Sequence, residues 1–198
     1  MWNSFRTDAR SAITAEVIRY HGGNGDEIHA YVVRPAADEP VPGIVAVHHL
    51  PGWDEFYREF AERLARHGYS VICPDLYCRF GHGTPDDVAA SVRSQGGVSD
   101  DSVVADCAAA LGWLKALPSS NGKAGIIGTC SGGRHALLAA SRTVGFDAVA
   151  DLWGGEWPRP RRSCRRPGRS RLSTTPPVSR HRCSGCSATM TPIPRPRR

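Results

Sequence analysis

Residues 128–133, Gly-Thr-Cys-Ser-Gly-Gly, constrain the fold of this chain more than any other segment. They follow a short apolar run at 124–127 and precede a helical pattern at 134–140. A strand, a Gly-x-nucleophile-x-Gly turn and a helix in this order are typical of a nucleophile elbow, here with cysteine where serine is commoner. The glycines are needed because the turn is tight, and a side chain on either would collide with the neighbouring strand or helix.

Such a turn would lift the Cys130 sulfur out at the top of a sheet and place it at the N-terminus of a helix. This end of a helix favours a thiolate and offers backbone N–H groups to an oxyanion. The segment therefore predicts a nucleophilic cysteine. The alternative is a buried cysteine beside a glycine turn.

The charges divide the chain into two parts. Residues 157–198 contain 12 Arg and 8 Pro with no Lys and no acidic residue, although the net charge of the whole chain is only +6. This leaves 13 basic and 19 acidic residues in 1–156, which is an ordinary acidic globular composition and long enough for one core. The tail has almost no apolar periodicity, so we expect residues 157–198 to be disordered.

Cysteine usage and targeting signals indicate the compartment. Four cysteines lie in the first part, at 73, 78, 107 and 130, and three lie in the tail. No signal peptide, lipidation motif or membrane-spanning run is visible, so we expect a cytoplasmic protein with free thiols and no membrane attachment. Cys183 and Cys186 have the spacing of half a zinc site, but no second pair accompanies them, so no metal is expected.

Strand and helix patterns alternate through residues 1–156. Segments 14–20 and 27–34 flank a glycine-rich turn and predict a hairpin. Apolar runs at 43–48, 69–73, 124–127 and 148–152 predict further strands. Helices are predicted at 56–67, at 134–140 and over 86–117, the last interrupted at 96–97 and resumed after a cap at Ser99 or Asp100. This order predicts an α/β fold with a mostly parallel sheet covered by helices on both faces.

Several segments between about residues 14 and 156 together resemble the dienelactone hydrolase family of α/β-hydrolases. They are His48-His49-Leu50-Pro51-Gly52-Trp53, Ala65-Arg66-His67-Gly68-Tyr69, Pro74-Asp75-Leu76-Tyr77-Cys78-Arg79, Asn121-Gly122-Lys123, the Cys130 turn and Asp151-Leu152-Trp153-Gly154-Gly155. The resemblance implies hydrolysis of a lactone or carboxylic ester by a cysteine in a Cys-His-Asp arrangement, without a cofactor or a metal. It also implies that intact relatives are monomeric and act on small molecules.

Site residues follow from this resemblance by position. Cys130 matches the nucleophile, and the backbone N–H groups of Ser131 and of a residue near Leu50 match the oxyanion hole. Arg79 matches an arginine that binds a substrate carboxylate, for which its planar donor fork is suited. The alternative for Arg79 is a surface ion pair. His49 stands where some members have a glutamate before the oxyanion turn, and we assign it to substrate binding as well.

The fold places an acid and then a histidine after the nucleophile, and this chain offers no such pair. After Asp151, the only acidic residue is Glu156 and the only histidine is His181. Asp151 itself comes too early to match the family acid. We therefore expect an α/β-hydrolase truncated after the strand that follows the Cys130 turn, with little or no catalysis. Its open sheet edge would favour aggregation.

The genetic code suggests how the tail arose. Codons compatible with residues 185–194 can spell Leu-Phe-Gly-Asn-Asp-Asp-Pro-Asn-Pro in the neighbouring frame, and the Asp that spans Met190 and Thr191 is forced. This peptide resembles the strand and acid segment of the family. The hypothesis is a one-base loss near codons 155–157, which genomic sequence would reject if stops interrupt the adjacent frame.

A functional basic tail is the alternative. Its charge density would suit non-specific binding to phosphate backbones, which would make the chain a nucleic-acid-binding protein without hydrolase activity. The tail lacks Lys, however, and has almost no aromatic residues to stack on bases. We therefore expect no specific nucleic-acid partner.

Overall fold

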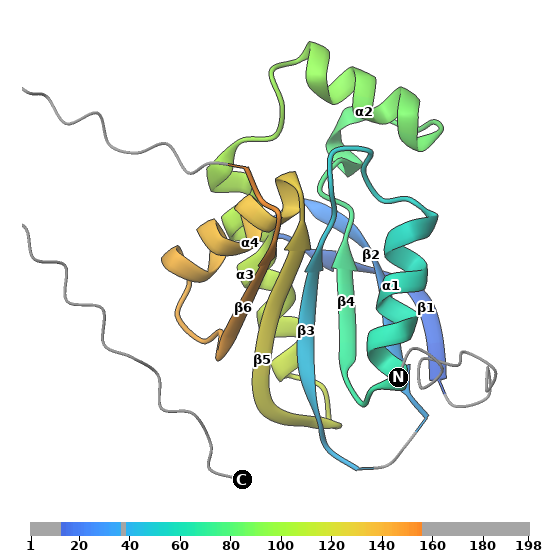
Figure 1. Cartoon of the computed structure of the whole chain (residues 1–198), viewed down its shortest axis with the longest axis vertical. Coiled ribbons are helices and arrows are strands. Elements are labelled where there is room, and N and C mark those ends of the chain that lie inside the picture. Colours follow the sequence, from blue (N-terminus) through green and yellow to red (C-terminus); the bar gives the residue numbers. More distant parts are fainter. Residues whose placement is uncertain (1–12, 37–38, 156–198) are drawn as a thin grey trace, which may run out of the picture. The chain divides into compact units, whose positions relative to one another are not determined.

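A six-stranded sheet organises the computed structural model, which describes residues 13–36 and 39–155 (Figure 1). The strands are β1 (Ile13–His21), β2 (Glu27–Pro35), β3 (Val41–Val47), β4 (Ser70–Pro74), β5 (Ser120–Thr129) and β6 (Ala148–Leu152). The helices are α1 (Glu55–Arg66), the short 3-10 helix η3 (Cys78–Phe80), α2 (Pro85–Ser94), α3 (Asp100–Lys115) and α4 (Ser131–Arg142). The tail for which we expect disorder, with His181, Cys183 and Cys186, lies outside the described residues.

The strands are ordered β1-β2-β4-β3-β5-β6 across the sheet. Strands β1 and β2 form the expected antiparallel hairpin, and β2 is also antiparallel to β4. From β4 through β3 and β5 to β6, all neighbours are parallel. The predicted mostly parallel α/β sheet is therefore confirmed. Strand β5 ends just before Cys130 and α4 begins just after it, next to the end of β3.

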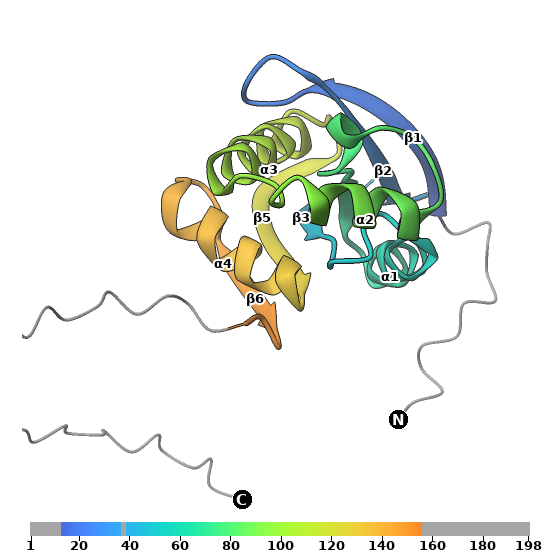
Figure 2. The same ribbon diagram turned by 90° about the horizontal axis from the view of Figure 1, so that it is seen from above.

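Helices lie on both faces of the sheet, and each face has its own apolar core (Figure 2). Helices α3 and α4 pack on one face, over β3, β5 and β6. Helix α1 packs on the other face, over β2 and β4. Ile126 belongs to the core under α3, and its neighbour Ile127 packs against the core under α1, because successive side chains in a strand point to opposite faces.

Side-chain caps fix where the helices begin. Asp54 accepts a hydrogen bond from the N–H of Tyr57 at the start of α1, and Ser99 accepts one from the N–H of Ser102 at the start of α3. These bonds satisfy N–H groups that have no partner within the helix. The predicted cap at Ser99 is confirmed. No helix among residues 13–36 and 39–155 is long and apolar enough to cross a membrane.

One strand differs from its predicted extent. The apolar pattern starts β5 at Ala124, whereas the structure starts it at Ser120. The added residues are polar and exposed or partly exposed, yet Val41 of β3 pairs with Ser120 through the backbone. Apolar periodicity cannot detect such an extension, because it depends on pairing with a neighbouring strand and not on burial.

Candidate active site

Cys130 occupies the single residue between β5 and α4. Its backbone has φ 52° and ψ −124°, a left-handed φ that is costly for a residue with a side chain. Cys130 is an exposed residue with a free thiol. The structure thus places Cys130 at the predicted strained turn, and its role as a nucleophile remains a prediction.

The glycines on either side permit this turn because backbone atoms approach them closely. A methyl group on Gly128 would overlap the carbonyl oxygen of Gly132, the second residue of α4. A methyl group on Gly132 would overlap the carbonyl oxygen of Val47 and lie 2.6 Å from that of His48, at the end of β3. The collisions with a strand and a helix expected from the sequence are therefore present.

Backbone hydrogen bonds hold Cys130 in place. Its N–H donates to the carbonyl oxygen of Leu152 at 2.9 Å, at the end of β6. Its own carbonyl oxygen accepts the N–H groups of Gly133 at 3.0 Å and Arg134 at 3.3 Å, which closes the first turn of α4. Strand β6 therefore supports the strained residue directly.

Tyr57, a fully buried residue of α1, supports the turn from the other face. Its hydroxyl oxygen accepts the N–H of Thr129 at 3.1 Å and shares a hydrogen bond with Thr129 Oγ1 at 2.9 Å. Thr129 precedes Cys130 and is also buried. One phenol thus satisfies two buried polar groups next to the strained residue.

Replacing Tyr57 with phenylalanine should loosen this turn. The buried Thr129 N–H and hydroxyl would lose their partner, which costs about 1–3 kcal/mol of unfolding free energy. The rate at which iodoacetamide alkylates Cys130, monitored by peptide mass spectrometry, should change severalfold. Tyr31→Phe is the matched control, because Tyr31 also loses a hydrogen bond on this face, to Glu62, away from the turn. Equal Cys130 alkylation rates in wild type and Tyr57→Phe would contradict the role of Tyr57.

The loop that begins at the end of β3 carries the predicted oxyanion donor near Leu50. The N–H of Gly52 donates to the carbonyl oxygen of His49 at 2.9 Å, and the Tyr77 hydroxyl donates to the carbonyl oxygen of Leu50 at 3.2 Å. Ser131 is the first residue of α4, so its N–H has no acceptor within the helix. The close approach of Gly132 to the end of β3 brings these two segments together.

His49 is fixed to the N-terminus of α1. Its Nε2 donates to Asp54 Oδ2 at 2.7 Å, and its ring stacks on Phe56 with centroids 5.4 Å apart. The ring also meets Tyr57 edge-on at 5.1 Å. Asp54 therefore joins the loop that contains His49 to α1, and Tyr57 joins α1 to the Cys130 turn. A role for His49 in substrate binding remains a prediction.

His48 is a packed residue at the end of β3. It is buried, its Nε2 accepts the N–H of Leu76 at 3.1 Å, and its Nδ1 donates to the carbonyl oxygen of His49 at 2.9 Å. Burial lowers the pKa of His48 to about 4. The imidazole is therefore neutral near pH 7 and serves the structure.

Stability should consequently fall as the solution becomes acidic. The unfolded chain protonates His48 near its ordinary pKa of about 6.5, whereas the folded chain does so only near a pKa of about 4. The His48 contribution is thus complete above about pH 6.5 and decreases toward pH 4. Between about pH 7.5 and 5, the loss from this group is about 2 kcal/mol. Urea unfolding at both pH values should show a smaller loss in His48→Gln, and an equal loss would contradict the assignment.

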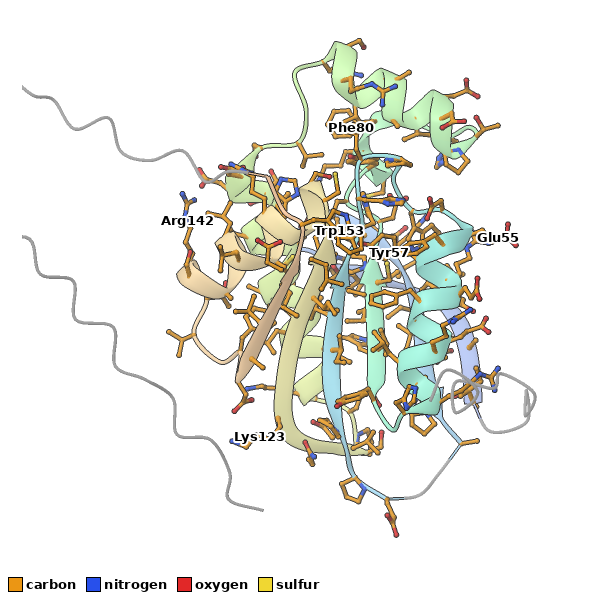
Figure 3. The ribbon with its side chains drawn as sticks, viewed as in Figure 1. Glu55, Tyr57, Phe80, Lys123, Arg142 and Trp153 are labelled. Atoms are coloured by element: carbon orange, nitrogen blue, oxygen red, sulfur yellow. The ribbon has the colours of Figure 1, made fainter. Side chains whose placement is uncertain are left out.

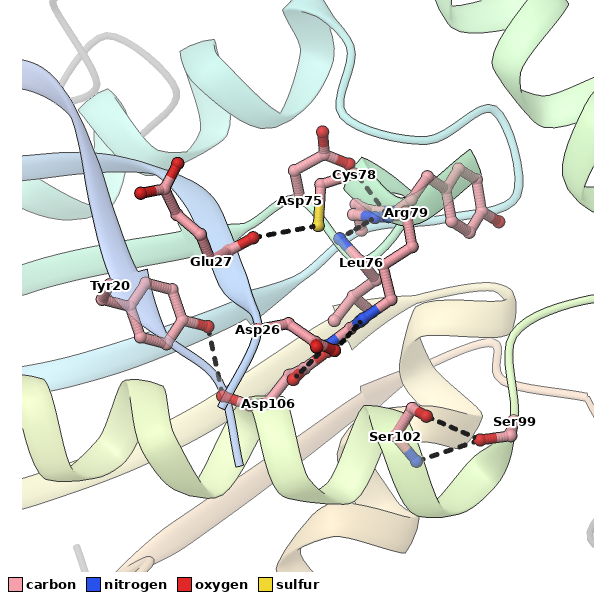
Figure 4. A network of polar contacts seen from close by, with 12 residues as sticks. Tyr20, Asp26, Glu27, Asp75, Leu76, Cys78, Arg79, Ser99, Ser102 and Asp106 are labelled. Atoms are coloured by element: carbon pink, nitrogen blue, oxygen red, sulfur yellow. Dashed lines mark hydrogen bonds and ion pairs between the residues drawn. The ribbon is translucent and has the colours of Figure 1, made fainter. Parts of the chain in front are cut away.

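Arg79, the predicted carboxylate-binding residue, is paired with carboxylates of the chain itself (Figure 4). Its Nη1 and Nη2 donate to the two oxygens of Asp106 at 2.8 and 3.0 Å, and its Nε donates to Asp26 at 2.6 Å. The Asp106 side chain is fully buried. The sequence left an ion pair open as the alternative for Arg79, and an ion pair is present. Because the Asp106 side chain is buried, the pair is not the expected surface pair. Substrate binding by Arg79 remains a prediction, and a substrate carboxylate would have to displace one of these partners.

The described residues bring no imidazole into hydrogen-bond contact with the Cys130 sulfur. Within the same residues, no cluster of three or more His, Cys, Asp or Glu side chains could hold a metal. Sequence reasoning missed Asp54 and Tyr57, the two residues that tie the loop, the helix and the turn together. An aspartate just before an apolar helical pattern is a recognisable N-cap signal that could have found Asp54. Nothing local marks the contact between Tyr57 and Thr129.

This chain is similar to known proteins both in sequence and in fold. The family model described as "Dienelactone hydrolase family" matches residues 28–171. A carboxymethylenebutenolidase of Pseudomonas putida is 34% identical over 145 residues, which cover 68% of this chain and 61% of the relative. The chain therefore spans less than two thirds of the length of that relative.

Solved structures show the same fold. A protein from Klebsiella pneumoniae assigned as a dienelactone hydrolase superposes with a TM-score of 0.65 and 30% identity, over 73% of this chain and 62% of that one. A dienelactone hydrolase-like promiscuous phosphotriesterase from metagenomic libraries superposes with a TM-score of 0.62 at 24% identity, over 76% and 63%, which supports the fold alone. From the match over residues 28–171, the chain belongs to the dienelactone hydrolase family.

Proposed function

We propose that this chain carries the nucleophile and the oxyanion donors of a hydrolase that cleaves carboxylic ester or lactone bonds in small molecules. The observation that carries the proposal is the strained, exposed Cys130 between β5 and α4. Strain of this kind persists only where the surroundings impose it, and here Leu152, Thr129 and two glycines do so. The name of the Pseudomonas relative points to the same class of bond.

The chemistry follows from the position of the sulfur. Cys130 would attack the carbonyl carbon as a thiolate, forming a carbon–sulfur bond while the carbonyl oxygen takes up the negative charge. The N–H groups of Ser131 and of the Leu50 loop would stabilise this oxyanion. Collapse of the intermediate expels the alcohol or opens the lactone, and leaves a thioester on Cys130. Water then releases the acid and restores the thiol.

These steps need a group that transfers protons to and from Cys130, and the described residues do not place one there. No imidazole among them contacts Cys130, and the neutral His48 already uses both ring nitrogens. We therefore propose that Cys130 becomes acylated by activated esters, whereas turnover is slow or absent. The proposal includes a cytoplasmic setting, supported by the free cysteines Cys73 and Cys107 in the core.

A labelling experiment tests both halves of the proposal. The full chain is mixed with p-nitrophenyl acetate, release of p-nitrophenol is followed, and acetylated peptides are located by mass spectrometry, because Cys164, Cys183 and Cys186 also carry thiols. A single burst with acetyl on Cys130 is expected, lost in Cys130→Ala and kept in the matched control Cys78→Ala. Sustained turnover that depends on Cys130 would contradict slow deacylation. Equal labelling of Cys78 and Cys130 would contradict the nucleophile assignment.

A further inference from the structure

Residues 49–52, which we call the oxyanion turn, are fixed by hydrogen bonds to one carbonyl group. The carbonyl oxygen of His49 accepts the N–H of Gly52 and the Nδ1–H of His48, both at 2.9 Å. In a planar trans peptide the following N–H points the opposite way, so these two bonds also fix the direction of the Leu50 N–H. Among the described residues this N–H has no acceptor. It is therefore a donor that the loop can offer to an oxyanion.

The sequence of the oxyanion turn makes it dependent on outside support. The hydrogen bond from Gly52 to His49 places Leu50 and Pro51 at the two central positions of the turn. Proline is disfavoured at the second of these positions in the commonest turn type, because it excludes helical backbone angles for the residue before it. We therefore expect the position of Leu50 to depend on contacts from the rest of the fold.

The Tyr77 side chain supplies such contacts from the segment that follows β4. Its hydroxyl donates to the carbonyl oxygen of Leu50 at 3.2 Å, and its ring meets the His48 ring edge-on with centroids 4.5 Å apart. The ring also lies against Gly52, because a Cβ on that glycine would be 3.0 Å from Tyr77 Cδ2. One side chain thus contacts the residue before the oxyanion turn, its second residue and its last residue.

Tyr77 is itself held in place. Its backbone N–H donates to Asp75 Oδ1 at 3.0 Å, and its ring meets Phe80 edge-on with centroids 6.4 Å apart. Figure 3 shows Phe80 at the end of the sheet where Tyr57 lies, with Lys123 at the opposite end. Burial is the largest of the influences that raise the pKa of Tyr77 above its usual value. The phenol therefore stays protonated at neutral pH and can donate its hydrogen bond.

We propose that Tyr77 is a positioning residue that holds the Leu50 N–H toward the oxyanion formed when Cys130 attacks an ester. This role rests on the proposed function, because it concerns the same reaction of Cys130. The Tyr77 hydroxyl fixes one carbonyl group of the oxyanion turn, and the ring packs against the rest. Without the hydroxyl, Leu50 could move, and its N–H would stabilise the oxyanion less well.

Two reactions of Cys130 separate this role from a purely structural one. Acetylation by p-nitrophenyl acetate passes through a tetrahedral oxyanion, which expels p-nitrophenolate and leaves a thioester. Alkylation by iodoacetamide forms a carbon–sulfur bond at a saturated carbon while iodide leaves, so it needs no oxyanion donor. Both reactions start from the thiolate, so a change in the thiol pKa affects both rates alike. The ratio of the acetylation rate to the alkylation rate therefore reports on the oxyanion hole.

Tyr77→Phe should lower this ratio about tenfold, which is less than the roughly 10²–10³-fold effect of losing a whole oxyanion donor. Tyr20→Phe is the matched control and should keep the wild-type ratio, because the Tyr20 hydroxyl also donates to a backbone carbonyl oxygen, that of Asp106, at 3.2 Å. An unchanged ratio in Tyr77→Phe, or an equal decrease in both variants, would overturn the role of Tyr77 and leave the proposed function standing. A wild-type chain that is not acetylated at Cys130 would overturn both.

A second variant reaches the same contact from the oxyanion turn. Gly52→Ala would press a methyl group against the Tyr77 ring and should lower the ratio severalfold. Gly25→Ala is the matched control, since Gly25 has a φ of 83°, similar to the 98° of Gly52, but no atom within 4 Å of the place of a Cβ. Circular dichroism would verify that the variants fold. If Gly52→Ala keeps the wild-type ratio, or if Gly25→Ala lowers it equally, Tyr77 does not position the oxyanion turn.

Discussion

Replacing Gly132 with alanine is expected to lower the free energy of unfolding by at least about 3 kcal/mol, one of the two largest effects that the structure predicts. The added methyl group would overlap the carbonyl oxygen of Val47 and lie 2.6 Å from that of His48. Both are backbone atoms at the end of β3, so relief requires β3 and α4 to separate. Their separation would also widen the predicted oxyanion hole.

Urea unfolding followed by circular dichroism measures this loss. Gly112→Ala is the matched control, because Gly112 lies in α3 with no atom near the place of a Cβ. Alanine there should raise stability by about 0.5–1 kcal/mol, since it favours the helix. If Gly132→Ala unfolds at the wild-type urea concentration, the close packing of α4 against β3 is wrong.

The sequence predicts the Cys130 turn well because its determinants are local. The two glycines, the preceding apolar run and the following helical pattern lie within twenty residues, and each reports a steric requirement of the turn. The same holds for the hairpin of β1 and β2 and for the Ser99 cap. The order of strands and helices then suffices for a mostly parallel sheet.

The supports of the site could not be predicted in this way. Tyr57 contacts Thr129 across 72 residues, and Arg79 contacts Asp106 across 27, with no local pattern that marks either pair. A positional match assigned Arg79 to a substrate, whereas its partners depend on where α3 packs.

Replacing Arg79 with alanine separates the two roles that this residue can have. The change would leave the fully buried Asp106 carboxylate without its bidentate partner, which costs about 3–5 kcal/mol of unfolding free energy. The Tyr20 hydroxyl, which donates to the backbone carbonyl of Asp106 at 3.2 Å, cannot neutralise the side chain. Arg142→Ala is the matched control, since Arg142 pairs with Asp101, whose side chain is 93% exposed, and such pairs contribute about 0–1 kcal/mol.

A double variant identifies the cause of the loss. Asp106→Asn added to Arg79→Ala should recover part of the stability, because it removes the buried charge while keeping the shape of the side chain. If the destabilisation came only from the lost contacts of the Arg79 side chain, Asp106→Asn would recover no stability. If Arg79→Ala instead keeps the wild-type unfolding midpoint, the ion pair adds little to stability. Cys130 alkylation by the anion iodoacetate and by neutral iodoacetamide would then be compared. If iodoacetate is the slower reagent only in Arg79→Ala, Arg79 is assigned to carboxylate binding.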